Sequence, residues 1–201
     1  MLESLLSFYA RYFPWRRGKY RIIERFGARP NAAGSFVRRA CLVYGYYKMD
    51  CDLRKHLQRQ FYYFRTYFLE ERILTTWLRY SADATLDFDV GANTGIYILA
   101  AASISPLIEI HAFEPTPEIA SHLRATAEIN GLEGRLHVHE KAVGVGSGSI
   151  FLNRLAGKKD DNEGMNFVST ERRTDSSIAV PMVSLAACRA FSKEQDWNRR
   201  D

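Results

Sequence analysis

The glycine-rich turn at residues 91–95 is the part of this sequence best suited to chemistry. It reads Gly-Ala-Asn-Thr-Gly, follows Asp89 at the end of a short apolar run, and precedes the apolar run 96–102. Glycine has no Cβ, so the backbone can come close to a ligand and adopt unusual φ and ψ angles. The N-terminus of a following helix offers free N–H groups. This order of strand, turn and helix predicts a site for a nucleotide-like ligand; a tight turn without a ligand is the alternative.

Glu114 is the second candidate for ligand binding. It directly follows the strand-like run 108–113 and is followed by Pro115, which removes a backbone donor and ends the strand. An acidic residue about 20 residues beyond the first glycine, at the tip of the second strand, is where an adenosine ribose is bound in this architecture. A carboxylate has two acceptor oxygens, one for each ribose hydroxyl. We therefore expect Glu114 to bind a ribose.

Two classes of cofactor fit this geometry. Dinucleotide enzymes carry Gly-x-Gly-x-x-Gly and place a pyrophosphate at the helix N-terminus. Here Asn93 stands where the second of those glycines would be, which hinders close approach to a pyrophosphate. The turn better suits a smaller zwitterionic group, such as the methionine part of S-adenosylmethionine (SAM). Asp89 can attract its ammonium directly or through water, so SAM is the expected cofactor and a dinucleotide is the alternative.

Several blocks of the sequence resemble the FkbM-type methyltransferase family. They are Asp89-Val90-Gly91-Ala92-Asn93-Thr94-Gly95, Phe113-Glu114-Pro115, Asn130-Gly131-Leu132, Ala142-Val143-Gly144, the segment from Asn162 to Phe167, and Val180 to Leu185. The resemblance runs from about Arg59 to Leu185. It implies a SAM-dependent methyltransferase, most of which in this family are O-methyltransferases, acting on a hydroxyl of a sugar, a glycan or a natural product. A non-catalytic SAM- or nucleoside-binding remnant and a dinucleotide-dependent oxidoreductase are the alternatives.

The expected cofactor-binding residues lie at three strand ends. The first and second ends supply the groups near the methionine and the ribose. By resemblance alone, the turn after the third strand supplies the neighbours of adenine, through backbone more than side chain. The full expected set is Asp89, Gly91, Ala92, Asn93, Gly95, Glu114, Lys141 and Ala142. Glu140 is a conceivable general base, but the sequence identifies no catalytic residue.

His137 and His139 are the candidates for a metal site. They lie two residues apart on an expected strand, so their side chains point to one face. That spacing suits two ligands, but no third ligand is evident nearby in the sequence. We therefore interpret both as ordinary core or surface histidines and expect no metal.

Strand-like and helix-like runs alternate through the middle of the chain. The expected strands are 85–90, 108–113 and 135–141, and the expected helices are 95–102 and 118–130. This alternation predicts an α/β fold with a doubly wound, mostly parallel sheet and right-handed crossovers. The resemblance makes it a Rossmann-like core of the class I methyltransferase type. Residues 81–185 are expected to form this SAM-binding core.

Residues 1–80 form a basic, aromatic-rich region with a different composition. They carry 16 Lys and Arg against 6 Asp and Glu, whereas the rest carries 12 against 17. The periodicity predicts helices over 2–13, 21–26, 53–64 and 69–80, and leaves 36–47 open between helix and strand. The segment 8–20 interleaves rings with cations. We interpret it as a packed helix with snorkelling arginines; contact with an anionic membrane or glycan, or less readily with nucleic acid, is the alternative.

Composition and cysteine usage favour a globular protein. Of 201 residues, 46% are hydrophobic and 25% charged, and no apolar run approaches the ~20 residues that span a bilayer. The start lacks the basic and small-residue features of a signal peptide. Cys41, Cys51 and Cys188 are scattered and show no metal spacing, which indicates reduced thiols. We therefore expect a cytoplasmic location, with peripheral membrane contact as a further possibility.

The sequence departs from the family pattern after Leu185. Members usually continue into a segment resembling Ile-Lys-Ile-Asp-Val-Glu-Gly, whereas residues 186–201 are mostly polar and show no strand pattern. We expect an irregular tail over 186–201 in a truncated or frame-shifted member. The cofactor half of the site would then be encoded and the substrate half incomplete.

Overall fold

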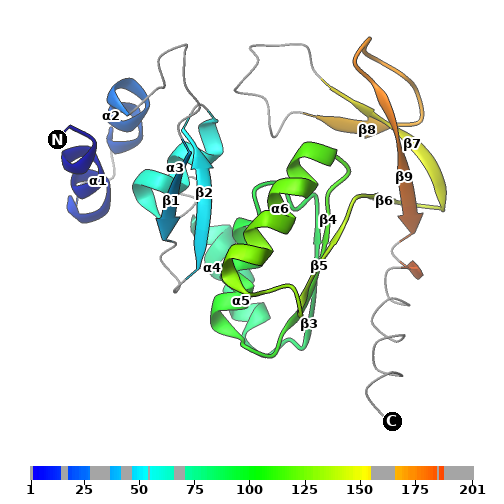
Figure 1. Cartoon of the computed structure of the whole chain (residues 1–201), viewed down its shortest axis with the longest axis horizontal. Coiled ribbons are helices and arrows are strands. Elements are labelled where there is room, and N and C mark those ends of the chain that lie inside the picture. Colours follow the sequence, from blue (N-terminus) through cyan, green and yellow to red (C-terminus); the bar gives the residue numbers. More distant parts are fainter. Residues whose placement is uncertain are drawn as a thin grey trace.

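The computed structural model describes residues 2–14, 18–27, 37–41, 47–53, 55–65, 71–154, 166–184 and 186–187. Helices of the described chain are α1 (Leu2–Tyr12), α2 (Lys19–Phe26), α3 (His56–Phe64), α4 (Glu71–Ser81), α5 (Ile96–Ile104) and α6 (Pro117–Asn130). Its strands are β1 (Val37–Cys41), β2 (Lys48–Asp52), β3 (Leu86–Val90), β4 (Glu109–Phe113), β5 (Leu136–His139), β6 (Ala142–Gly144), β7 (Gly148–Asn153), β8 (Phe167–Ser169) and β9 (Ile178–Ser184). The strands form three sheets, which Figure 1 shows with their helices.

The central sheet is parallel and has the order β3-β4-β5. Helix α5 connects the first two strands and α6 connects the last two. The register places Asp89 opposite Ala112 and His111 opposite His137. The predicted α/β class with a parallel, Rossmann-like sheet is confirmed, and every predicted element between residues 85 and 141 is present within a few residues.

The main core lies between this sheet and its two crossover helices. Alternation along β4 turns Ile110 and Ala112 toward the helices, where they pack with Leu99 of α5 and Leu123 of α6. Figure 1 shows α5 and α6 on the same side of the strands. Burying each large apolar side chain contributes about 1.5–3 kcal/mol, so this face is the main source of the sheet's stability. The opposite face carries His111 and Phe113.

Residues 1–80 contain strands as well as helices. The undecided segment 36–47 includes strand β1, and β1 pairs with the unexpected strand β2 in an antiparallel hairpin. Sequence reasoning missed β2 because its outward residues are lysine and aspartate, which are uncommon in strands. Its inward residues Met49 and Cys51 are fully buried in the same core as Leu99 and Ile110. Residues of the N-terminal region therefore contribute to the same core as the parallel sheet.

The first two helices pack on α3 in a smaller core of their own. It contains Leu6, Ala10, Ile23, Tyr63 and Phe64. Lys19, one of the cations in the segment 8–20, is buried here, and its Nζ donates to the carbonyls of Ala10 at 2.9 Å and Phe13 at 2.5 Å. A lysine that satisfies carbonyls at the end of α1 is a helix cap and not a surface charge.

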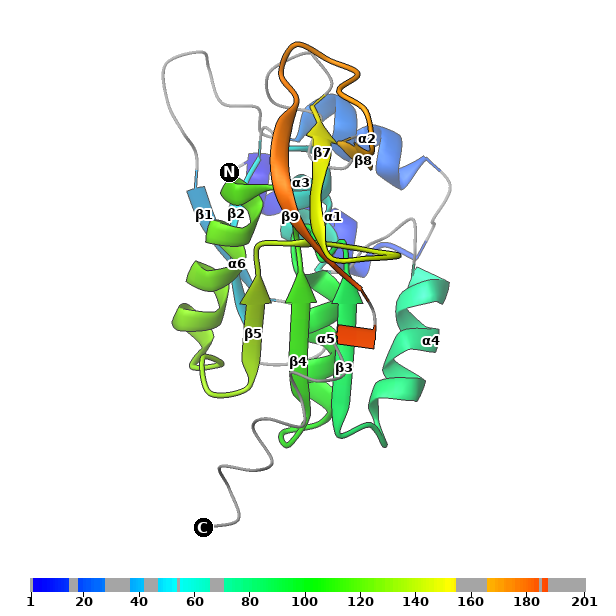
Figure 2. The same ribbon diagram turned by 90° about the vertical axis from the view of Figure 1, so that its right-hand side faces the viewer.

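The second sheet has the order β6-β9-β7-β8 and is mixed. Strand β6 runs parallel to β9, whereas β7 is antiparallel to both β8 and β9. Only two residues separate β5 from β6, so the chain passes directly from the first sheet to the second. Figure 2 shows the arrowheads of β3, β4 and β5 pointing toward this second sheet. Residues 180–184 of the block that resembles the family from Val180 onward belong to β9.

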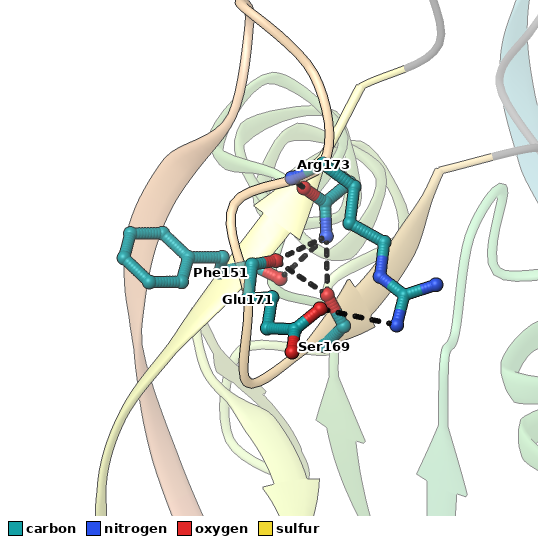
Figure 3. A network of polar contacts seen from close by, with 5 residues as sticks. Phe151, Ser169, Glu171 and Arg173 are labelled. Carbon is teal, nitrogen blue, oxygen red and sulfur yellow. Dashed lines mark hydrogen bonds and ion pairs between the residues drawn. The ribbon is translucent and has the colours of Figure 1, made fainter.

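A network of polar contacts holds the end of the second sheet. Asn153 is fully buried; its Nδ2 donates to Ser169 Oγ at 2.8 Å, and its Oδ1 accepts from Ser177 Oγ at 2.6 Å and from the Arg173 N–H at 2.7 Å. Figure 3 shows Ser169, Glu171 and Arg173 converging in this network. The side chain amide thereby ties β7 to β8 and to the turn before β9.

Three further expectations concern small parts of the chain. No described helix has the length and apolarity needed to cross a membrane. Cys51 is a free thiol, and burial, reinforced by the charge of Asp50, raises its pKa to about 12, so it stays protonated. Residues 162–165, Cys188 and the expected irregular tail beyond Ala187 lie outside the described residues.

Candidate functional site

A cavity of about 480 Å³ lies at the carboxyl ends of the parallel strands. This is where open α/β sheets bind ligands, and the volume is typical of a small-molecule pocket. One wall comes from the parallel sheet and its loops: Val90, Gly91, Asn93, Phe113, Glu114, Pro115, Thr116 and Lys141. The other wall comes from the second sheet and its approach: Ala142, Val143, Leu152, Asn166, Phe167 and Val168. The cavity therefore lies between two sheets.

The glycine-rich turn is tied to the second strand of the parallel sheet. The N–H groups of Gly91 and Ala92 both donate to the carbonyl of Phe113, at 2.8 and 3.2 Å. Gly91 has a φ of +78°, and a Cβ built on it would meet no atom within 4 Å. The backbone of Gly91 is therefore open to the cavity, as the sequence predicts for a ligand that approaches closely.

Two other residues of the turn serve the fold instead. Gly95 has a φ of +81°, and an added Cβ would lie 2.7 Å from Leu123 Cδ2, so close packing of α5 on α6 requires glycine there. Ala92 is buried in the main core. Of the expected set, Gly91, Asn93, Glu114, Lys141 and Ala142 line the cavity, whereas Asp89, Ala92 and Gly95 do not.

Asp89 lies at the end of β3, directly before the turn. Burial, with the negative charges of Asp87 and Glu114 as lesser causes, raises its pKa to about 7. Within the described chain, its Oδ2 is buried without a hydrogen-bond partner, and so is Oδ1 of Asn93. Native proteins leave few buried polar atoms unpaired. Two such acceptors at one turn provide a place for a cationic or N–H group.

Glu114 positions the loops as well as lining the cavity. Its side chain is 5% exposed; Oε2 accepts the N–H of Asn93 at 3.0 Å, and Oε1 accepts the N–H of Thr116 at 2.9 Å. The sequence predicts a ribose contact but not these two bonds to the backbone. Each carboxylate oxygen has a second lone pair, so a ligand hydroxyl can still bind.

The third strand end differs in detail from its expected role. The N–H of Lys141 donates to the carbonyl of His139 at 2.9 Å, and the N–H of Glu114 reaches the same carbonyl at 3.0 Å. The amide of Lys141 is therefore already paired within the chain, and an adenine contact there would need other atoms. Glu140, the conceivable base, pairs with Arg124 at 3.1 Å and does not line the cavity.

Apart from Ala142, the residues of the second wall were not predicted as part of the site. Its apolar members include Leu152 of β7 and Phe167 and Val168 of β8. The signals were the short apolar run at residues 150–152 of β7 and the place of Asn166 and Phe167 in a segment resembling the family. Neither signal shows that the pairing of β7 with β8 and β9 places these residues over the glycine turn.

A cluster of histidines occupies the face of the parallel sheet that α5 and α6 leave uncovered. Strand β4 brings Glu109 and His111 beside His137 and His139 of β5, so the expectation that no third ligand lies near the latter two is wrong. The parallel register of β4 with β5 is the cause. Burial lowers the pKa of His111, and burial with neighbouring positive groups lowers the pKa of His139 to about 4.

The fold and the cavity define an α/β protein with a ligand site at the carboxyl edge of a Rossmann-like sheet. No protein-family model matches the chain. Over 49 residues it is 45% identical to the 31-O-demethyl-FK506 methyltransferase FkbM of Streptomyces tacrolimicus, which supports the resemblance noted from the sequence. The match covers 24% of this chain and 19% of that protein, so the chain spans about a fifth of the curated relative it matches.

One solved structure was also similar. It is a SAM-dependent methyltransferase from Agrobacterium tumefaciens, with a TM-score of 0.39 and 13% identity, covering 53% of this chain and 32% of that one. The fold assignment rests on the strand order and register described above.

Proposed function

We propose that this chain binds SAM in the cavity between its two sheets and acts in methyl transfer. The observation that carries the proposal is a pair of buried acceptors, Asp89 Oδ2 and Asn93 Oδ1, which have no hydrogen-bond partner in the described part of the chain and lie at a glycine turn beside a cavity of about 480 Å³. The similarity to a methyltransferase over 49 residues supports it. The site suits SAM because the amino acid part of SAM carries an ammonium, which Asp89 can attract. The nucleoside part carries ribose hydroxyls, which Glu114 can accept.

Each residue of the turn has a separate task in this proposal. Asp89 attracts the ammonium, directly or through water, and the open backbone at Gly91 admits the methionine part. Glu114 accepts a ribose hydroxyl with the lone pairs that the backbone leaves unused. Lys141 and Ala142 border the adenine. SAM supplies the electrophilic methyl group, while the chain supplies orientation and proximity.

The acceptor is proposed to be a hydroxyl group on a sugar, a glycan or a natural product. The relative named above is a methyltransferase of an O-demethyl compound, which supports oxygen as the accepting atom. Transfer of radiolabelled methyl from SAM onto glycan or lipid extracts tests this. Binding of SAM with no transfer to any extract would favour the non-catalytic alternative.

The decisive experiment is calorimetric titration with SAM, S-adenosylhomocysteine and NAD. We expect binding of the first two, and a loss of about 1–3 kcal/mol of binding free energy in Glu114→Gln, because a charge-assisted hydrogen bond to the ribose is lost. Glu133→Gln is the matched control, since it removes the same charge from an exposed position. A folded chain that binds neither SAM nor S-adenosylhomocysteine refutes the proposal, and binding of NAD alone would favour a dinucleotide enzyme.

We further propose a cytoplasmic location with peripheral contact to an anionic membrane through α1. Leu5, Phe8 and Tyr12 form a stripe of that helix and are 60%, 64% and 67% exposed. Co-sedimentation with vesicles of phosphatidylcholine and phosphatidylserine, compared with phosphatidylcholine alone, measures the contact. Phe8→Ser should reduce binding to the anionic vesicles and Ile73→Ser, an exposed apolar control on α4, should not. If the parent chain, Phe8→Ser and Ile73→Ser sediment equally with the anionic vesicles, the proposed contact through α1 is contradicted.

A further inference from the structure

The face of the parallel sheet opposite α5 and α6 gathers groups that bind metal ions. Glu109 and His111 lie two residues apart on β4, so both side chains point to this face. The register places His137 of β5 directly opposite His111. Three potential ligands from two neighbouring strands therefore meet at one point, outside the cavity assigned to SAM.

The distances between the ligating atoms suit a single ion. Oε1 of Glu109 lies 3.2 Å from Nε2 of His111 and 3.3 Å from Nε2 of His137. All three atoms lie within 4.8 Å of one another. Tetrahedral zinc, with bonds of about 2.0–2.2 Å, requires its ligand atoms to be about 3.4 Å apart. The carboxylate is therefore already at the required separation from both rings, and only small adjustments are needed to enclose an ion.

The hydrogen bonding of the two rings also favours an ion. Among the described residues, Nε2 of His137 is buried and makes no well-aligned hydrogen bond, and its near contact is Oε1 of Glu109 at 3.3 Å. Nδ1 of His111 lies 2.9 Å from Nε2 of His139, which is the arrangement that orients a metal-ligating histidine through its second nitrogen. The rings of His111 and His139 are stacked at 6°, and Phe113 stacks on His139. His111 is therefore held with Nε2 directed toward Glu109.

We propose that Glu109, His111 and His137 bind one divalent first-row transition-metal ion, with zinc as the best fit. Two imidazole nitrogens and a carboxylate oxygen form a known zinc ligand set, whereas magnesium prefers oxygen ligands throughout. The side chains of Glu109 and His137 are 20% and 22% exposed, so the ion can enter from solvent and hold water at its fourth position. His139 is a positioning residue for His111. The bound ion links β4 to β5.

Zinc titration of the full, tag-free chain after chelator treatment tests this site, with a chromophoric chelator as competitor. We expect one ion per chain, and no comparable binding of magnesium. Glu109→Gln and His137→Ala should each weaken zinc binding more than tenfold, since even partners of a metal ligand are worth about 10–100-fold. His122→Ala is the matched control, because it removes a histidine of α6 outside the cluster. Circular dichroism verifies the fold of each variant.

The unmodified chain provides a second, independent readout. With one equivalent of Co²⁺, ligation by the cluster should produce the intense visible absorption of a four- or five-coordinate ion, and added zinc should abolish it. A weak spectrum typical of hydrated Co²⁺ would overturn the proposal even if the variants fail to fold. So would absence of zinc binding, or equal zinc affinity of Glu109→Gln, His137→Ala and His122→Ala. The cluster would then be a network of hydrogen bonds alone.

Discussion

The two sheets that border the cavity differ in how polar side chains near it are paired. On the parallel-sheet side, Asp89 Oδ2 and Asn93 Oδ1 have no hydrogen-bond partner among the described residues. In the second sheet, Asn153 bonds to Ser169, Ser177 and the backbone of residue 173. An unpaired buried polar atom costs about 1–3 kcal/mol. The comparison indicates that the first wall holds acceptors for a ligand, whereas the second uses its polar groups to maintain its own structure.

The largest effect should come from the apolar support beneath the first wall. Leu123 is 1% exposed and packs under Gly95, so Leu123→Ala should lower the free energy of unfolding by about 2–5 kcal/mol, because it leaves a cavity in the main core. Urea denaturation measures this, and the exposed Ser121→Ala on the same helix is the control. If Leu123→Ala lowers the free energy of unfolding no more than Ser121→Ala does, the first wall does not depend on this packing.

The carboxylate of Asp89, whose Oδ2 has no hydrogen-bond partner among the described residues, should make stability depend on pH. The pKa of Asp89 is about 7 in the folded chain and about 3.9 in an unfolded one, so the folded state holds the proton more tightly. The stabilisation that comes from the protonated Asp89 carboxyl is therefore present at low pH and is lost as pH rises from about 4 to 7. In the ligand-free protein, Asp89→Asn should remove this loss, on the order of a few kcal/mol. Parallel stability profiles of both proteins across this range would contradict the prediction.

Breaking the satisfied network of the second wall should cost less than the core substitution. Asn153→Ala leaves Ser177 and the N–H of Arg173 without their acceptor, so we expect a loss of about 1–3 kcal/mol in unfolding free energy. Thermal denaturation measures it, with the exposed Ser176→Ala in the adjacent turn as the control. If both variants unfold alike, water replaces the lost amide and the network is not structural.

The two glycines of the turn should separate binding from packing. Alanine at either position incurs about 1–2 kcal/mol because both adopt left-handed backbone conformations. Gly95→Ala should cost more, since its Cβ also meets Leu123 at 2.7 Å, whereas Gly91→Ala should mainly weaken binding of S-adenosylhomocysteine. Unfolding and calorimetric titration of both variants give the comparison. The reverse pattern would place the ligand at Gly95.

The smallest effect concerns the surface connection between the two walls. Arg154, after β7, pairs with both oxygens of Glu118 on α6, at 2.9 and 3.1 Å, and both side chains are partly exposed. Exposed ion pairs contribute about 0.2–1 kcal/mol. A double-mutant cycle of Arg154→Ala and Glu118→Ala should give a coupling in that range that declines with salt. A larger, salt-independent coupling would mean that this pair fixes the position of the second sheet.

The first wall was largely predictable because its signals are local. A glycine turn, an acid at the next strand tip and alternating apolar runs are read within stretches of about ten residues. Gly91, Asn93 and Glu114, which sequence reasoning selected, line the cavity, and their binding of a cofactor stays a prediction. It could not separate Gly91 from Gly95, because only the position of Leu123 on the next helix shows which glycine packs against protein.

The remaining differences arose where contacts join distant parts of the chain. Strand β2 was missed because its stability comes from Met49 and Cys51 entering a core formed by later elements, against weak local propensity. The histidine cluster was missed because Glu109 and His137 are 28 residues apart and meet only through the register of β4 with β5.

By itself, the sequence determined the order of strands and helices between residues 85 and 141, the glycine turn and the acid that serves it. Those features follow from backbone preferences and from the spacing of apolar residues along a single strand or helix. Only the tertiary structure decided which side chains lie across from one another. It closed the cavity with the second sheet, buried Oδ2 of Asp89 away from any hydrogen-bond partner in the described chain, and gathered the histidines. The physical reason is that burial and register depend on pairing between strands, which no local stretch of the chain encodes.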